Sequence, residues 1–487
     1  MSSIRAHEVG FAYDASSSLF EDVSFHLTSG WTGLVGANGA GKTTLLRLIT
    51  GELQPTAGQL KREPKDARVV VCEQRVELAS DALTSFAWAG DGLARRLHGR
   101  LRLEPTQLDR WPTLSPGERK RWQLGAALWS EPDVLLLDEP TNHLDADGRR
   151  LLVDTLGGFG GVGVVVSHDR ALLDALTQAT LRVHGGTARL WNAPFTQAHA
   201  AWSLEARQLR DAQLETRRAL QKERRRLDDK RRTLEASSRQ RNTGERMRSR
   251  YDSDARTLMS GGRAEMAEKM HAASLRRTAR KADALSDELA AIVVRDDPGQ
   301  QLFIDWEPCP RSVVLTLDEA ALEHANDVTQ LALGRDEHVW VRGRNGAGKT
   351  TLLHRVREAS TLPPERVLWL PQELSLDETL EDLEAVKQLP PDERGRVFQL
   401  VHALGVEPEK LLATRAPSPG EGRKLRLAAG LAQQAWLTVL DEPTNHLDLP
   451  AIERLQAALT AYPGALLLVT HDEALGEAVT SKQLLLG

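Results

Sequence analysis

Residues 36–44 read GANGAGKTT, a glycine-rich segment that ends in a lysine and two threonines. In this spacing, backbone N–H groups can converge on a polyphosphate without Cβ clashes, and a following helix presents its positive end to the same charge. Lys42 is expected to reach the β- and γ-phosphates of a nucleoside triphosphate, and the Thr43 hydroxyl to bind Mg²⁺. The predicted phosphate-binding residues are Gly36, Asn38, Gly39, Gly41, Lys42, Thr43 and Thr44.

Four apolar residues, VLLL at 134–137, lead into two carboxylates, Asp138 and Glu139. Such a run is typical of a buried parallel strand, and Asp138 at its C-terminal end is placed to hold Mg²⁺ through water. Glu139 is placed to polarise an attacking water as a general base. Alone, the pattern fits equally a strand that ends in solvated carboxylates. Its pairing with the phosphate-binding segment predicts hydrolysis of a nucleoside triphosphate.

These side chains need strands that deliver them to one edge of a sheet. Residues 34–49 predict a short apolar strand, a glycine-rich turn and an amphipathic helix, which is the context that phosphate binding requires. VVVCEQ at 69–74 and VVVSHD at 164–169 each predict another strand with a polar end. We therefore expect an α/β fold with a parallel sheet, whose phosphate-binding turn is open at the carboxyl ends of the strands.

The same order of motifs returns in the second half of the chain. GRNGAGKTT at 343–351 repeats the phosphate-binding segment, and LTVLDEP at 437–443 repeats the acidic strand end. Ser418, Asp441 and His471 each lie 303 residues after an identical residue, and this constant offset indicates an internal duplication. The corresponding residues are Gly343, Asn345, Gly346, Gly348, Lys349, Thr350 and Thr351 for phosphate, Thr350 and Asp441 for Mg²⁺, and Glu442 for the base.

Further motifs complete an ordered set in each half. LSPGE at 114–118, TNHLD at 141–145 and the strand end at His168, together with Gln74, resemble the motifs of an ATP-binding cassette (ABC) domain. Each motif is weak alone, but their order and spacing argue against a chance match. The resemblance assigns Gln74 and Gln372 to Mg²⁺, the signature residues Ser115, Gly117, Ser418 and Gly420 to ATP, Asp145 and Asp448 to the D-loops, and His168 and His471 to the switch histidines.

The resemblance also implies two P-loop ABC domains that close head to tail over two ATP molecules. The signature residues of one cassette would then cover the ATP that is held by the phosphate-binding segment of the other. Closure would depend on ATP and opening on its hydrolysis.

The candidate for stacking on adenine is Tyr13, which lies 29 residues before Lys42. Phe11 is the competing choice, and an ordinary core role suits either ring equally. No aromatic residue stands at the corresponding place in the second half, where His324 is the alternative.

A basic insert separates the two halves. Residues 201–290 contain 23 Lys plus Arg and 15 Asp plus Glu, a net charge of +8, whereas the whole chain carries −5. The remainder therefore carries −13, so charge is strongly segregated along the chain. We predict a first nucleotide-binding domain at 1–197, a linker at 198–300 and a second nucleotide-binding domain at 301–487.

The pattern of the linker is helical. Residues 201–238 contain no glycine or proline, and their leucines predict the apolar stripe of a coiled-coil-like arm. A polar stretch around 237–263 breaks the pattern, which resumes from Glu265, so we predict an α-helical hairpin with its tip near 240–262. A solvated coiled coil is the alternative reading of the charge, but clustered arginines on an otherwise acidic chain favour a nucleic-acid target. The leucines of the first arm are Leu204, Leu209, Leu214, Leu220, Leu227 and Leu234.

Tandem cassettes joined by a basic helical linker, with DEPTNHLD at 138–145 and again at 441–448, are similar to the F subfamily of ABC proteins (ABC-F). The resemblance covers almost the whole chain. It implies an ATPase that binds the ribosomal E site and uses its linker on P-site tRNA or the peptidyl-transferase region. The implied role is translation regulation or antibiotic resistance by ribosome protection. We expect rRNA contacts through the linker and a monomer with intramolecular cassette pairing.

Composition limits the other classes. Cys72 and Cys309 fit no ligand spacing and are expected to be buried small hydrophobes in a reducing cytosol. No run of about 18 apolar residues occurs, so we expect a cytoplasmic protein without a stable membrane partner. A branched-DNA-binding ATPase for genome maintenance is an alternative, and the energy subunit of a transporter is another that leaves the basic insert unexplained. Chromosome-type coiled-coil ATPases are excluded, because they split one cassette around the coil.

Overall fold

The computed structural model describes residues 2–14, 17–74, 76–141, 144–244, 254–291, 306–317, 330–344, 346–414 and 416–486. Asn345, His324 and the central part of the predicted hairpin tip, 245–253, lie outside the described residues. The chain divides into two compact units, one made of Met1–Ala198 with Pro298–Gly487 and the other of His199–Asp297. The first unit holds both cassettes, and the second is the linker.

The first cassette is built on a six-stranded sheet with the order β5-β6-β7-β3-β8-β9. All pairings are parallel except that of β8 with β9. Every apolar residue of β6 and β7 is buried, as expected for parallel strands that are covered on both faces. The strands are β3 (Gly30–Gly36), β5 (Val69–Cys72), β6 (Val134–Asp138), β7 (Val162–Val166), β8 (Ala179–His184) and β9 (Thr187–Trp191).

A second, antiparallel sheet with the order β2-β1-β4 packs with the main sheet into one buried cluster. Leu45 and Leu48, on one face of the first helix, belong to the same cluster, which fixes that helix beneath the phosphate-binding turn. The strands are β1 (Ser3–Asp14), β2 (Ser17–Leu27) and β4 (Ala57–Glu63); the helices are α1 (Lys42–Thr50), α2 (Asp81–Ala87), α3 (Gly92–Leu101), the 3₁₀ segment η1 (Pro105–Thr113), α4 (Pro116–Trp129), α5 (Ala146–Leu156) and α6 (Arg170–Leu176).

The second cassette repeats this plan. Its five-stranded sheet has the order β13-β14-β15-β12-β16, which matches β5-β6-β7-β3-β8 strand for strand, and all of its pairings are parallel. The duplicated α/β fold predicted from the repeated motifs is therefore confirmed. The sheet strands are β12 (His338–Gly343), β13 (Val367–Leu370), β14 (Leu437–Asp441), β15 (Ala465–Val469) and β16 (Lys482–Leu486), with the pair β10 (Val313–Leu317) and β11 (Leu331–Gly334) beside them.

The helices of the second cassette follow the same order. Two of them, α9 and α13, occupy the places of α1 and α4 after the phosphate-binding segment and the signature segment. The helices are α9 (Lys349–Ala359), the 3₁₀ turn η4 (Pro364–Arg366), α10 (Leu376–Gln388), α11 (Pro391–Ala403), α12 (Pro408–Ala413), α13 (Pro419–Ala432), α14 (Leu449–Thr460) and α15 (Glu473–Val479).

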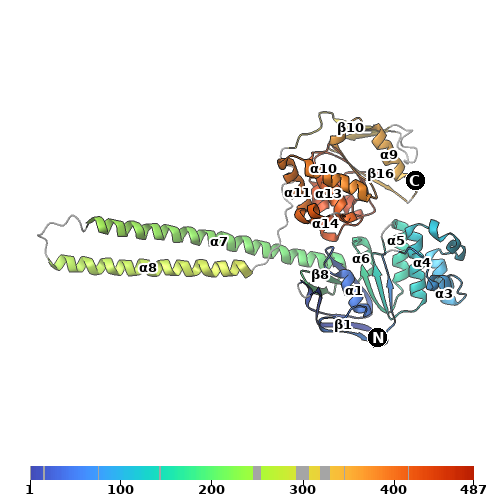
Figure 1. The fold of residues 1–487 in the computed structure, drawn as a ribbon, viewed down its shortest axis with the longest axis horizontal. Helices are drawn as coiled ribbons and strands as arrows, with labels where there is room; N and C mark the ends of the chain where they lie inside the picture. The colour runs from blue at the N-terminus through green and yellow to red at the C-terminus, as the bar shows by residue number, and fades with distance from the viewer. Residues whose placement is uncertain are drawn as a thin grey trace. The chain divides into compact units, whose positions relative to one another are not determined.

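Two long helices, α7 (Phe195–Gly244) and α8 (Asp254–Ala291), form the linker and lie side by side (Figure 1). Polar side chains join them. Lys230 Nζ donates to Ser274 Oγ and Thr278 Oγ1, at 2.8 Å each. The buried carboxylate of Glu223 lies 3.3 Å from Lys281 Nζ. The predicted pair of helical arms is thus present in the described residues, but the predicted break at 237–263 is too wide, because α7 continues to Gly244 and α8 begins at Asp254.

The predicted leucine stripe is wrong for the first half of α7. Leu220 is buried and Leu227 is half-buried, but Leu204, Leu209 and Leu214 are exposed, and the side chain of Leu234 lies outside the described residues. Positions five apart are rotated by about 140° from one another around a helix, so these three leucines cannot share a face, whereas positions seven apart can. Of the predicted leucines, only those spaced seven apart, Leu220 and Leu227, lie on a face of α7 that is at least half-buried.

Cys72 and Cys309 are free and buried, as predicted. Burial raises the pKa of the Cys72 thiol to about 12, which makes it a poor nucleophile. Among the helices that the structure describes, none has the length and apolar character needed to cross a membrane.

Candidate functional site

Each phosphate-binding segment turns into its helix through a left-handed glycine. Gly41 (φ 100°) precedes α1 and Gly348 (φ 86°) precedes α9. A Cβ on Gly41 would lie 2.5 Å from the Phe20 ring, and one on Gly36 would lie 2.5 Å from the carbonyl oxygen of Val183. Gly41 is therefore required by both its backbone conformation and its close packing, Gly348 by its conformation and Gly36 by its packing.

The two lysines of these segments are held in the same way. Lys42 Nζ donates to the carbonyl oxygens of Gly36 (2.8 Å) and Ala37 (3.0 Å). Lys349 Nζ donates to those of Gly343 (2.7 Å) and Arg344 (3.1 Å). Burial lowers the pKa of both lysines, and the carboxylates at the nearby strand ends oppose that shift. Each ammonium is thus preorganised inside its loop.

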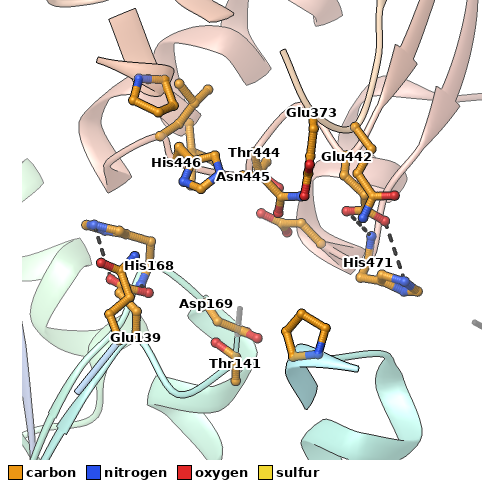
Figure 2. Close-up of a pocket in the computed structure, with 18 of the residues that line it drawn as sticks. Glu139, Thr141, His168, Asp169, Glu373, Glu442, Thr444, Asn445, His446 and His471 are labelled. Atoms are coloured by element: carbon orange, nitrogen blue, oxygen red, sulfur yellow. Dashed lines mark hydrogen bonds and ion pairs between the residues drawn. The ribbon is translucent and has the colours of Figure 1, made fainter. Parts of the chain in front are cut away.

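A glutamate and a histidine meet at the ends of neighbouring strands in each cassette (Figure 2). His168 Nε2 lies 3.3 Å from Glu139 Oε1, and the backbone N–H of His168 donates to Glu139 Oε2 at 3.4 Å. In the second pair, His471 Nε2 lies 3.5 Å from Glu442 Oε1, and the His471 N–H donates to Glu442 Oε2 at 3.2 Å. The duplication therefore reproduces the geometry of the pair.

Burial sets the protonation of these groups. It raises the pKa of Glu139 to about 8 and that of Glu442 to about 7. It lowers the pKa of His168 to about 3 and that of His471 to about 4. Within the described residues, Oε1 of each glutamate accepts no hydrogen bond, so it can accept one from water. A carboxylate with a raised pKa near neutrality suits general-base catalysis.

The signature segments begin the helices α4 and α13. Ser115 Oγ accepts the Glu118 N–H at 3.2 Å, and Ser418 Oγ accepts the Glu421 N–H at 3.3 Å. Each glutamate carboxylate returns to the backbone N–H of its serine, at 2.8 Å and 2.7 Å. These reciprocal caps fix the positive ends of both helices.

Most of the predicted site residues line one cavity of about 1300 Å³. Gly36, Gly117 and Gly343 do not line it. Gly36 and Gly343 end strands β3 and β12, and Gly117 is buried in α4. The predicted residues in the cavity wall are Tyr13, Asn38, Gly39, Gly41, Lys42, Thr43, Thr44, Gln74, Ser115, Asp138, Glu139 and His168 from the first cassette, and Gly346, Gly348, Lys349, Thr350, Thr351, Gln372, Ser418, Gly420, Asp441, Glu442 and His471 from the second.

The cassettes touch at the first phosphate-binding segment. The Asn38 N–H donates to Asp448 Oδ2 at 2.7 Å, which joins that segment to the D-loop of the second cassette. Asp448 also caps α14 through the Ala451 N–H, at 3.1 Å. This contact has the head-to-tail sense expected of paired cassettes.

Comparison with known proteins agrees with the motifs. The ABC transporter family model matches residues 20–142 and 327–445. The tylosin resistance ATP-binding protein TlrC of Streptomyces fradiae is 33% identical over 547 aligned residues, which cover 99% of this chain and 97% of TlrC. The ribosome protection protein VmlR of Bacillus subtilis (strain 168) is 30% identical over 477 residues, which cover 93% of this chain and 81% of VmlR. The chain belongs to the ABC-F subfamily.

A solved structure supports the fold of this ABC-F protein independently. The RNase-L Inhibitor superimposes with a TM-score of 0.59 over 98% of this chain and 87% of its own, at 17% identity. That likeness concerns the tandem-cassette fold. The matched cassettes and the ABC-F relatives also identify the chain as an ATPase, as its motifs predicted.

The motifs did not reveal two buried cations in the ABC-F cassettes, Lys120 on α4 and Arg423 on α13. Lys120 Nζ donates to the carbonyl oxygens of Glu73 and Asp138. Arg423 donates to the carbonyl oxygens of Pro371 (3.2 Å), Gln372 (2.8 Å), Asp441 (3.1 Å) and Glu442 (2.7 Å). Each cation therefore joins the Gln74- or Gln372-containing loop to the catalytic strand end. The signal in the sequence was a basic residue in each half at positions 303 apart.

Tyr13 and Phe11 separate clearly in the structure. Phe11 is buried in the core, whereas 62% of Tyr13 is exposed and its ring lines the cavity. The Tyr13 hydroxyl shares a hydrogen bond of 2.9 Å with Thr44 Oγ1, and its ring meets Phe11 edge to face at 4.9 Å. A ring held in this way is accessible to adenine, and the stacking role itself stays a prediction.

Tyr13→Ala is expected to weaken ATP binding at the first site by about two- to tenfold, because an aromatic stacking contact contributes ~0.5–1.5 kcal/mol. Titration of ATP into a chain that also carries Lys349→Ala isolates the first site. Tyr13→Phe is the control, since it keeps the ring and removes only the hydroxyl bonded to Thr44. Equal affinities for the alanine and phenylalanine variants would reject stacking.

Proposed function

We propose that this ABC-F ATPase binds the ribosome at its E site in the ATP-closed state and directs its linker at P-site tRNA or the peptidyl-transferase region. The action would serve translation regulation or antibiotic resistance by ribosome protection, and it would take place in the cytoplasm. The names of TlrC and VmlR record tylosin resistance and ribosome protection for those relatives. The observation that carries the proposal for this chain is the exposed arginine surface of its linker.

That surface lies on α7. The guanidinium groups stand in closely spaced clusters, and arginine pairs with phosphate through two parallel N–H···O bonds. Clustered arginines on an otherwise acidic chain suit the phosphates of an RNA backbone. The exposed basic residues are Arg207, Arg217, Arg218, Lys222, Arg224, Arg225, Arg226, Arg231 and Arg232.

The cassettes supply ATP hydrolysis. The donors near the phosphate-binding segments are a hydroxyl, an amide and a carboxylate oxygen, which suit Mg²⁺, and we propose that they hold it together with the ATP phosphates. When bound, Mg²⁺ would neutralise charge on the phosphates. The proposed ligands are Thr43, Gln74 and Asp138 at one site and Thr350, Gln372 and Asp441 at the other.

The other steps belong to side chains of the chain itself. We propose that Lys42 and Lys349 bind the β- and γ-phosphates, and that Glu139 and Glu442 take a proton from the attacking water. His168 and His471 would hold those carboxylates in place. The signature residues Ser418 and Gly420 would cover the ATP at Lys42, and Ser115 with Gly117 would cover the ATP at Lys349. Loss of the γ-phosphate would remove these cross-cassette contacts and let the cassettes open.

Sedimentation with 70S ribosomes tests this proposal. The Glu139→Gln/Glu442→Gln chain is expected to co-sediment with ribosomes in the presence of ATP and to leave them when ATP is omitted. Absence of the chain from the ribosomal fraction with ATP would reject ribosome binding. Strong binding of the same chain to branched DNA would then favour the alternative function in genome maintenance.

Linker variants of the Glu139→Gln/Glu442→Gln chain test whether the arginine charges of α7 contribute to ribosome binding. Arg224, Arg225 and Arg231 are exposed, and their combined replacement by glutamine is expected to weaken ribosome binding. The salt dependence of binding should become less steep, by about one unit of slope for each arginine that no longer neutralises a phosphate. Asp283→Asn/Asp287→Asn/Glu288→Gln is the matched control on the exposed surface of α8. If both variants sediment alike, the arginine surface does not bind the ribosome.

A further inference from the structure

The two cassettes differ at the helix that follows each D-loop. Helix α5 carries Asp147 and Arg149 in its first turn, whereas the equivalent positions in α14, 303 residues later, are Pro450 and Ile452. Ile452 is buried in the core of its own cassette. Pro450 and Ile452 therefore cannot make the charged contacts that Asp147 and Arg149 can make at the equivalent positions.

Arg149 makes such a contact, and its side chain is 14% exposed. Its Nε lies 2.9 Å from Asp169 Oδ2 in the first cassette. Its two terminal nitrogens, Nη1 and Nη2, both donate to the carbonyl oxygen of His471 in the second cassette, at 3.3 Å each. One guanidinium thus joins the segment after His168 to the switch histidine of the other cassette.

The first end of this link is rigid. Asp169 follows His168 directly and caps α6, since its Oδ1 accepts the Leu172 N–H at 3.0 Å. Because the Asp169 carboxylate is held by the ion pair with Arg149 and by the hydrogen bond at the helix end, it cannot rotate without losing one of them. The position of Arg149 therefore follows the position of the first cassette's switch segment.

The second end bears on catalysis. His471 is the residue whose backbone N–H and ring both contact Glu442. A guanidinium that holds the carbonyl oxygen of His471 restrains the peptide on which that pair depends. Burial raises the pKa of Glu442, and the positive charge of Arg149 opposes that rise; burial lowers the pKa of His471, and the charge of Arg149 adds to that fall.

A second charged contact reaches the same site. Arg344 Nε, in the second phosphate-binding segment, lies 3.4 Å from Asp147 Oδ2 on α5. This pair is exposed, so we assign it little energy. It shows that the first turn of α5 lies against both the phosphate-binding and the switch segments of the second cassette.

We propose that Arg149 is a positioning residue that couples the switch segment of the first cassette to the catalytic pair of the second. Hydrolysis at the Lys349 site then depends on the first cassette through Arg149. The Lys42 site has no such coupling through an arginine, because Ile452 stands at the equivalent position of the second cassette. The two ATP sites of this ABC-F protein therefore differ in how hydrolysis at each depends on the other cassette.

The test measures nucleotide trapping at each ATP site separately, in a full chain that carries no other substitution. Radiolabelled 8-azido-ATP is trapped with vanadate and crosslinked by light, and the label is assigned to each cassette by peptide mapping. Arg149→Met is expected to lower trapping in the second cassette about tenfold and in the first less than twofold. Steady-state hydrolysis by a Glu139→Gln chain should show the same loss in kcat, with KM for ATP changed less than twofold.

Two further variants keep the test decisive. Arg149→Lys retains a cation that can reach one of the two partners, and it is expected to recover at least a third of the lost trapping. Arg170→Met is the matched control, because Arg170 Nη1 donates across the same interface to Gln456 Oε1 at 3.0 Å without touching a catalytic pair; trapping in the two cassettes should keep its ratio. Equal loss in both cassettes with Arg149→Met, or no loss in the second, would overturn the proposal.

Discussion

Replacing Glu139 and Glu442 together with glutamine is expected to lower kcat for ATP hydrolysis by about two to four orders of magnitude, the range that a positioned general base contributes. The amide cannot take a proton from water, whereas its size and its contact with the histidine N–H are retained. ATP should bind at least as well as before, because the lysines and the glycine-rich turns are untouched. Phosphate release at saturating ATP and equilibrium ATP binding measure the two effects.

A matched pair of substitutions controls for the change of charge. Glu52 and Glu358 lie on the surface near the ends of α1 and α9, and their replacement by glutamine should leave kcat within twofold. A fall of less than tenfold in the Glu139/Glu442 double variant would show that another group takes the proton.

Arg423→Met is expected to destabilise the second cassette by about 3 kcal/mol or more. Four buried carbonyl oxygens lose their donor, and each unsatisfied buried group costs ~1–3 kcal/mol. Burial lowers the pKa of Arg423 to about 10, yet the group stays charged at neutral pH, so its four bonds are charge-assisted. The midpoint temperature of the cassette's thermal unfolding and the rate of ATP hydrolysis at its site should both fall.

Arg423→Lys separates the positive charge of this residue from the number of hydrogen bonds that it donates. A lysine at the same place in the first cassette, Lys120, bonds to two carbonyl oxygens, so the lysine variant should recover part of the stability. Arg355→Met, on the exposed face of α9, is the control for loss of a surface arginine. If Arg423→Met unfolds at the same temperature as the parent chain, the four hydrogen bonds carry no net stability.

The residues of the phosphate-binding and acidic strand-end motifs could be predicted because their chemistry depends on local spacing. The glycines around Lys42 predict a turn, and the four apolar residues before Asp138, in company with that turn, predict a strand end. Arg149 could not be predicted in this way, since its partners Asp169 and His471 lie on other elements and, for His471, in the other half of the chain. Its only mark in the sequence is a difference from Ile452, and a difference between repeats does not reveal a contact.

Lys120 and Arg423 were missed for a related reason. In a sequence, a basic residue on a helix that starts with a polar cap looks solvated. Only the packing of α4 and α13 against the sheets turns these side chains inward, where strand-end carbonyl groups need donors. The leucine pattern erred in the opposite direction, because Leu204 and Leu209 are apolar but face solvent.

The polar seam of the linker has a mechanical consequence. Two helices joined only by leucines can slide past each other by a turn, since one apolar side chain replaces the next. Lys230 is bonded to Ser274 and Thr278, four residues apart on α8, and Glu223 is paired with Lys281, so both sets of bonds exist together in one register. Slippage would leave the half-buried ammonium of Lys230 and the buried carboxylate of Glu223 without these partners. The hairpin therefore resists shear, and a displacement applied at one end of α7 is carried along its length as the movement of a stiff rod.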